Sequence, residues 1–329
     1  MREDRINFSI IIRMALSLLP VFLGLPTVAV VMCAYNLAMS IILIGPVTGL
    51  VSSLSTVLLS MLFYGFIAPV GELMGLFLAL EAIIMGVICA VVMLKGYSFY
   101  KGVWLSGIGY LAISFIEVMH SAHKMGQSVA DYLTLASFEQ IKIQFLQMIE
   151  QLQIGEKEIM AVFEAIRKIT VMVIPSTLVL MSIIIGYTVM WCVNYFLRKI
   201  PAFKKDAHSF ALLRMPKMAI LFMILVSVLC FVLKSENIVY VLINVAVVFG
   251  GLSFFSGMSV VDFFLRKKIK AMFPRIGVHF LIYMLSGLIT GIIPYANIIF
   301  VYVIIAMLDS FINFRRIKPS EEGESNEEE

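Results

Sequence analysis

The stretch from Phe8 to Leu94 restricts the possible folds of this chain most, because almost every residue in it is apolar. Only Arg13, Glu72 and Glu81 are charged there. A helix needs about 20 residues to cross the roughly 30 Å hydrocarbon core of a bilayer, since each residue adds about 1.5 Å. The stretch therefore predicts three or four membrane-spanning helices.

The composition of the whole chain agrees with a lipid environment. Hydrophobic residues make up 61% of the 329 residues and charged residues 14%, and the mean hydropathy is +1.01. A soluble domain is about half apolar and a quarter charged. The net charge of +4 comes from short cationic clusters between apolar runs. This pattern indicates cytoplasmic loops beside anionic lipid, and we find no nucleic-acid-binding module.

The cationic clusters also predict the topology, because Lys and Arg concentrate on the cytoplasmic side. If every cluster is cytoplasmic, an even number of crossings separates each pair, which favours four spans before Lys95 over three. Breaks are expected near Gly24–Pro26, Gly45–Pro46 and Pro69–Gly71, since Pro and Gly interrupt helices. The chain is predicted to have about ten spans, with eight as the alternative, and both termini in the cytoplasm. The clusters are Arg2/Arg5, Lys95/Lys101, Arg198–Lys205, Arg266–Lys270 with Arg275, and Arg315–Lys318.

The expected fold is an all-α, polytopic transmembrane helix bundle in the cell membrane, with an amphipathic helical insertion between spans five and six. The later spans are expected at Gly102–His120, Ile169–Phe196, Met218–Leu233, Ile238–Leu265, Ile276–Ile293 and Ile298–Phe311. The predicted domains are a six-helix membrane half at 1–120 and 166–200, an external insertion at 121–165, a four-helix membrane half at 201–318, and a disordered acidic tail at 319–329.

The insertion carries apolar residues at helical spacing in two segments, one on each side of Gly155. This period of about 3.6 residues predicts amphipathic helices. A hairpin packed over the bundle, a lid over a substrate site and a membrane-surface anchor all fit the pattern. The residues are Ile141, Phe145, Met148, Ile149 and Leu152, then Ile159, Val162, Phe163 and Ile166.

Ionisable residues inside apolar runs are the candidate site, because a charge in hydrocarbon is costly unless it is paired or wet. Glu72, Glu117 and His120 fall near the external ends of predicted spans, and Glu81 lies deeper in its span. We predict that these four residues line a polar, substrate-binding pocket. Glu117, His120 and His123 also have a spacing that suits metal ligands, but no further ligand cluster accompanies them, so we predict no metal site.

Other polar residues have a structural interpretation. Asp262 precedes Arg266 by four residues, which predicts an ion pair on one helix face. Asp309 lies one to two turns before Arg315 and is interpreted as a contact that fixes helix ends. The four cysteines lie in apolar stretches without a CxxC pair and are predicted to be buried, unpaired residues: Cys33, Cys89, Cys192 and Cys230.

The sequence contains no Walker GxxxxGK[ST], HExxH or GxSxG motif. We therefore predict neither an enzyme nor a cofactor. Several glycines suit close helix packing, including Gly250, Gly251 and Gly257.

Two resemblances follow from short segments. Segments FALLRMPK (Phe210–Lys217), GGLSFFSGMSVVDFFLRKK (Gly250–Lys268) and MLDSFINFRR (Met307–Arg316) resemble the YybS-like family of predicted bacterial membrane proteins, whose function is unknown. Segment GPVTGLVSSLSTVLLSMLFYG (Gly45–Gly65) is similar to a helix of the substrate-binding S components of energy-coupling factor transporters. That second resemblance implies a bound small molecule, with coupling and ATPase subunits as separate chains.

Three functions remain open from the sequence. The first is a small-molecule binding or transport subunit, indicated by the predicted outward pocket. The second is a non-transporting scaffold or regulator that binds a cytoplasmic partner, indicated by the basic loops and the acidic tail. The third is a lipid-directed membrane enzyme, which would require a buried acid such as Glu81 or Asp309.

Overall fold

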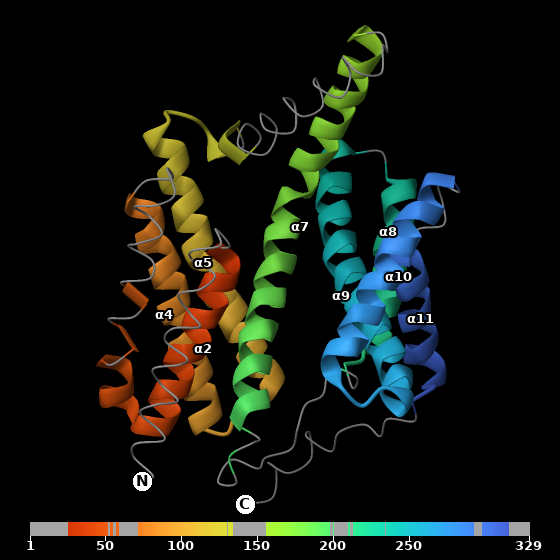
Figure 1. Ribbon diagram of the computed structural model, residues 1–329. Coiled ribbons are helices and arrows are strands. Elements are labelled where there is room, and N and C mark those ends of the chain that lie inside the picture. The colour runs from red at the N-terminus through yellow and green to blue at the C-terminus, as the bar shows by residue number, and fades with distance from the viewer. Residues whose placement is uncertain are drawn as a thin grey trace, which may run out of the picture. The chain divides into compact units, whose positions relative to one another are not determined.

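The computed structural model consists of α-helices joined by turns wherever the chain is described (Figure 1). It describes residues 26–51, 53–54, 57–58, 72–129, 131–133, 156–197, 200, 210, 213–233, 235–292 and 298–315. The helices with defined bounds are α2 (Pro26–Ile44), α4 (Glu72–Leu94), α5 (Phe99–Lys124), α7 (Glu156–Leu197), α8 (Lys217–Val232), α9 (Glu236–Lys268), α10 (Met272–Ile292) and α11 (Ile298–Ile312). The predicted all-α fold is confirmed.

Five of these helices are long and apolar enough to cross a membrane within the described ranges. The segments are Pro26–Ile44, Gly75–Leu94, Phe99–Lys124, Arg167–Leu197 and Asn237–Lys268. Two shorter apolar helices, Lys217–Val232 and Ile299–Ile312, accompany them. The total of ten spans stays a prediction.

The chain divides into two compact units, Met1–Ala207 and His208–Glu329. The first unit contains α2, α4, α5 and α7, and the second contains α8 to α11. The domain division at residue 200/201 that was expected from the sequence stays a prediction.

In the first unit, α2 is buried along most of its length, from Ala29 to Ile42. It ends at Ile44, directly before Gly45, whose φ of 116° suits glycine and few other residues. The break expected near Gly45–Pro46 is therefore present. Helices α4 and α5 form an antiparallel hairpin, because the short Lys95–Ser98 turn leaves no room for another arrangement.

Helix α7 has 42 residues, which gives a length of about 63 Å at 1.5 Å per residue. Its candidate span covers only Arg167–Leu197. The turns before Arg167 extend past the ends of α4 and α5 (Figure 1). The amphipathic segment expected at Ile159–Ile166 is therefore the start of the same helix as the span, while the segment expected at Ile141–Leu152 lies outside the described residues.

Aromatic rings gather where α5 begins and α7 ends. Ring centroids of Phe99 and Tyr187 lie 5.4 Å apart, and those of Trp191 and Tyr195 lie 5.5 Å apart. The Lys101 ammonium lies 4.2 Å above the Tyr97 ring. Tyr and Trp beside Lys are typical of the water–lipid interface, so this end of the first unit fits the membrane surface.

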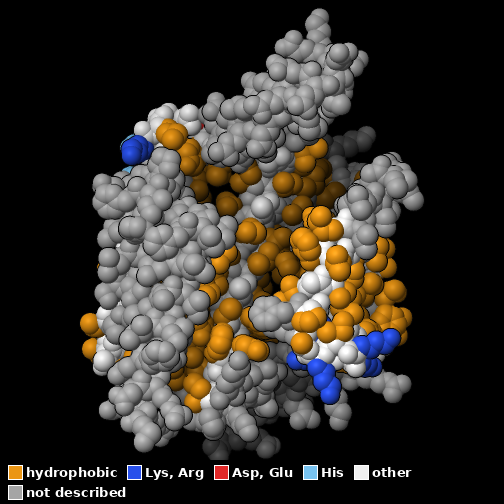
Figure 2. Space-filling view, in the orientation of Figure 1, with side chains coloured by type: hydrophobic (Ala, Val, Ile, Leu, Met, Phe, Trp, Pro, Cys, Tyr) orange, Lys and Arg blue, Asp and Glu red, His pale blue; other side chains and the backbone are white. Residues whose placement is uncertain are grey.

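In the second unit, α9 packs against α8, α10 and α11. Few residues of its candidate span are fully buried, and most of the others are half-buried. Hydrophobic side chains cover much of the visible described surface, and Lys and Arg gather at one end of the second unit (Figure 2). Exposed apolar surface of this extent suits a protein surrounded by lipid.

Candidate functional site

The Glu81 carboxyl group lies inside the first unit, on α4, and is 2% exposed. The Ser114 hydroxyl, on α5, donates a hydrogen bond to Glu81 Oε1 at 2.6 Å. Glu81 Oε2 has no hydrogen-bond partner among the described residues. A buried polar atom without a partner costs about 1–3 kcal/mol, so this arrangement lowers stability.

Two further polar groups of α5 lie beside this carboxyl group. Tyr110 and Glu117, one turn before and one turn after Ser114, both lie within electrostatic range of Glu81. Close packing brings the two helices together here, since a Cβ added to Gly109 would lie 2.7 Å from Ile84 Cγ2. The result is a polar strip along an apolar interface, which we call the Glu81 cluster: Glu81, Tyr110, Ser114 and Glu117.

The structure brings together part of the predicted substrate pocket. Glu81 and Glu117 share the α4–α5 interface, and His120 is exposed one turn farther on, with its ring 5.8 Å from Phe77. Glu72 begins α4, and its side chain lies outside the described part. The substrate-binding role of these residues stays a prediction.

Sequence reasoning missed Tyr110 and Ser114. A signal was present, because Tyr110, Ser114 and Glu117 follow the i, i+4, i+7 pattern of one helix face. In the described ranges, no three His, Cys, Asp or Glu side chains are placed to share a metal ion. This holds also for Glu117, His120 and His123.

A second interior polar group belongs to Asn36 on α2. Asn36 is 1% exposed, and neither its Oδ1 nor its Nδ2 has a hydrogen-bond partner within the described ranges. The nearby Ser40 hydroxyl donates a hydrogen bond to the Asn36 backbone carbonyl at 2.9 Å, and not to the amide side chain. Unpartnered polar groups inside membrane helices are costly, which makes them candidates for function.

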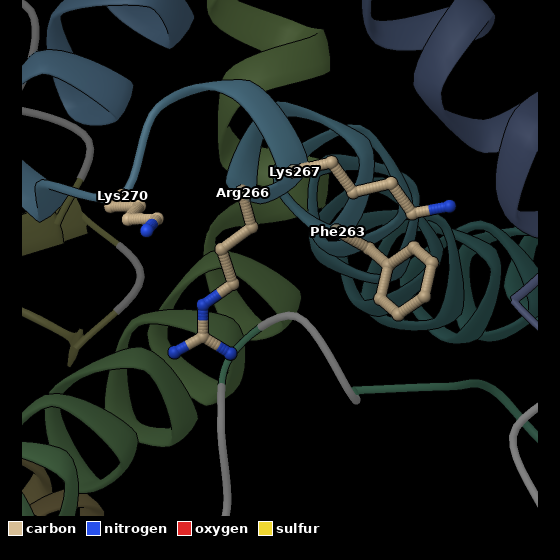
Figure 3. A pocket seen from close by; sticks show the side chains of 4 residues that line it. All are labelled: Phe263, Arg266, Lys267 and Lys270. Atoms are coloured by element: carbon tan, nitrogen blue, oxygen red, sulfur yellow. The ribbon is translucent and has the colours of Figure 1, made fainter.

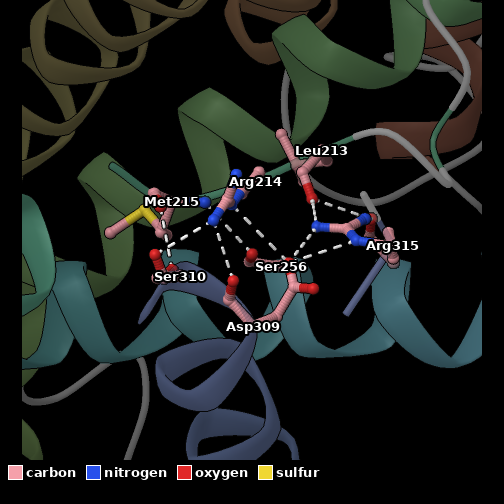
Figure 4. A network of polar contacts seen from close by, with 8 residues as sticks. Leu213, Arg214, Met215, Ser256, Asp309, Ser310 and Arg315 are labelled. Carbon is pink, nitrogen blue, oxygen red and sulfur yellow. Dashed lines mark hydrogen bonds and ion pairs between the residues drawn. The ribbon is translucent and has the colours of Figure 1, made fainter. Parts of the chain in front are cut away.

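The second unit contains a polar network of a different kind (Figure 4). Arg315 Nη2 lies 2.8 Å from Asp309 Oδ2, and Arg315 Nη1 donates to the Ser259 hydroxyl at 2.6 Å. Arg315 also donates to the Leu213 carbonyl at 2.9 Å. Arg214 donates to the Asp309 and Ser310 carbonyls at 2.9 and 3.0 Å. These bonds join the end of α11 to α9 and to the segment before α8.

A second buried ion pair joins α9 to α10. Arg275 Nε lies 2.7 Å from Asp262 Oδ1, and its Nη1 donates to the carbonyls of Ile269 and Lys270 at 3.1 and 2.9 Å. The sequence suggested Arg266 as the partner of Asp262. Arg275 occupies that position instead, while the Arg266 side chain is exposed. These contacts close the turn between α9 and α10.

The four cysteines form no disulfide within the described residues. The predicted burial is confirmed for Cys33 and Cys89, whereas Cys192 and Cys230 are half-buried.

Comparison with known proteins gives one match. The family model described as "Predicted membrane protein (DUF2232)" matches residues 7–310. No curated protein and no solved structure matches the chain. The resemblances to YybS-like proteins and to S components therefore stay predictions.

Proposed function

Because this chain belongs to the DUF2232 family of predicted membrane proteins, we propose that it acts within the bilayer, as a small-molecule binding or transport subunit. The observation that supports this proposal is the Glu81 cluster. A carboxyl group with one unpartnered oxygen, within a candidate span, is expensive to maintain. Such groups in membrane helices commonly mark ligand and ion pathways.

The chemistry of the cluster indicates the kind of ligand. Glu81 and Glu117 supply carboxyl oxygens, and Tyr110 and Ser114 supply hydroxyl groups. Among the described residues, neither carboxyl group forms an ion pair with Lys or Arg. A ligand that carries an amine or another N–H donor would satisfy Glu81 Oε2. We therefore expect a small cationic or donor-rich molecule.

The test is to purify the full chain in mild detergent, denature it, and identify released small molecules by mass spectrometry. Wild type should release a compound that the Glu81→Gln variant retains at least tenfold less, because a hydrogen bond to a charged group contributes about 1.5–3 kcal/mol. Glu164→Gln is the matched control, since Glu164 is exposed on α7 and pairs with the exposed Arg167 at 3.6 Å.

Two outcomes would contradict the proposal. One is a wild-type protein that releases no compound under any growth condition tested. The other is a compound released equally by wild type, Glu81→Gln and Glu164→Gln.

Transport would require further subunits, and we propose that coupling and ATPase subunits are separate chains. Affinity purification of the intact chain from cells should then recover an ATPase together with a membrane partner. If a ligand is bound but no ATPase is recovered, binding remains supported and energy-coupled transport is excluded.

A further inference from the structure

The second unit has a strongly cationic patch where α9 ends. The candidate span Asn237–Lys268 closes with three consecutive cations, Arg266, Lys267 and Lys268, and Lys270 follows in the linker. The side chains of all four are exposed. Because the apolar span stops here, these groups lie at the depth of the lipid headgroups.

An open hollow of about 430 Å³ lies at this patch, lined by Phe263, Arg266, Lys267 and Lys270. In Figure 3, Arg266 lies between Lys270 and Phe263. The Lys267 ammonium is 5.3 Å from the centre of the Phe263 ring and 5.2 Å from that of Phe264. These cation–π contacts hold one positive charge beside two apolar rings. The hollow thus combines charge with an apolar wall.

Within the described residues, Lys267, Lys268 and Lys270 form no ion pair with an acidic side chain. Residues 263–275 contain no Asp or Glu. The preceding acid, Asp262, is buried and bonded to Arg275. The carboxyl end of α9 contributes only about half a negative charge, against four cationic side chains. The patch is therefore complementary to an anion.

We propose that this hollow binds the headgroup of an anionic phospholipid, with the phosphate on Lys267 and Lys270 and the acyl chains along the apolar surface of α9. Two observations favour a lipid over a soluble anion: the depth of the patch, and the exposed Phe264 ring at its edge, 46% exposed. The site lies in the second unit and is independent of the proposed small-molecule function.

The test uses the full chain, delipidated in nonionic detergent, and native mass spectrometry with phosphatidylglycerol or phosphatidylcholine. Wild type should bind at least one phosphatidylglycerol more tightly than phosphatidylcholine. Lys267→Gln/Lys270→Gln should weaken that binding about 25-fold, which is about fivefold for each lysine. Lys267→Arg/Lys270→Arg keeps the charge and should keep the binding.

The matched control is Lys95→Gln/Lys101→Gln, which removes two exposed cations, one of them above Tyr97, in the first unit. It should retain the tight phosphatidylglycerol adduct. Equal loss in both double variants, or equal binding of the two lipids, would overturn the proposal. Displacement of the lipid by millimolar inorganic phosphate would also overturn it, in favour of a free-anion site. So would a soluble protein that competes for the patch and binds it more tightly than lipid.

Discussion

Arg315 Nη2 lies 2.8 Å from Asp309 Oδ2, and the two side chains are 0% and 1% exposed. Arg214 approaches the same carboxyl oxygen at 3.8 Å. The Ser259 hydroxyl accepts a further bond from Arg315. Two arginines and one aspartate thus fix three separate segments, and the loss of one member leaves a buried charge behind.

The first prediction concerns this ion pair. Asp309→Ala should lower the free energy of unfolding by about 3–5 kcal/mol, because Arg315 would remain buried without its counter-ion. The measurement is thermal or denaturant unfolding of the purified chain in detergent. Glu164→Ala, which breaks an exposed pair, should have a small effect. Equal stability of the two variants would show that the buried pair contributes no more to the free energy of unfolding than the exposed pair does.

The second prediction concerns the turn between α9 and α10. Arg275→Lys should loosen it, because a lysine cannot bond Asp262 through Nε and the carbonyls of Ile269 and Lys270 through Nη1 at once. Limited trypsin digestion should then cleave faster after Lys268 or Lys270. The control, Arg266→Lys, changes an exposed arginine of the same segment. Unchanged cleavage in Arg275→Lys would contradict the prediction.

The third prediction compares two glycines of α9. A Cβ at Gly257 would collide with the backbone carbonyl oxygen of Tyr302 on α11, whereas one at Gly250 would meet nothing within 4 Å. Gly257→Ala should therefore separate α9 from α11 and lower the melting temperature. Gly250→Ala should leave it unchanged or raise it, since alanine is the better helix former. The same response at both positions would contradict the packing shown here.

The sequence predicted the helices well, because long apolar runs and the Gly45–Pro46 break are local signals. It also pointed correctly to close packing at Gly257. It did not distinguish Gly257 from Gly250, because the difference depends on whether Tyr302 lies opposite. Packing partners of this kind are decided by tertiary structure and not by spacing along one helix.

The candidate site shows the same difference between what local sequence patterns predict and what tertiary structure decides. Glu81 stood out as an acid in an apolar run, but its partner Ser114 lies 33 residues away, on another helix. For Asp262, the sequence favoured the neighbouring turn and therefore Arg266. The chain turns after Lys270, and α10 therefore places Arg275 beside Asp262 instead. A local pattern identifies the costly group, but only the fold identifies what pairs with it.

The fourth prediction is topological. Lys95 and Lys124, both exposed, lie just before and at the end of α5, which spans 26 residues, or about 39 Å. A membrane-impermeant maleimide should label Lys124→Cys in intact cells. It should label Lys95→Cys only after the cells are permeabilised. The parent chain without either substitution gives the background from its native cysteines. Labelling of both positions in intact cells would contradict a membrane-spanning α5.

The last prediction separates function from stability at Glu81. Glu81→Leu removes the unpartnered Oε2 from the interior and fills the space with apolar atoms, so the variant should be as stable as wild type or about 1–3 kcal/mol more stable. It should at the same time lose the co-purifying ligand. Asp309→Leu is the matched control, a buried acid that already has its arginine partner, and it should destabilise the chain. Equal destabilisation by the two substitutions would show that Glu81 stabilises the fold as Asp309 does. An acid that is kept for ligand binding should instead lower the stability of the chain.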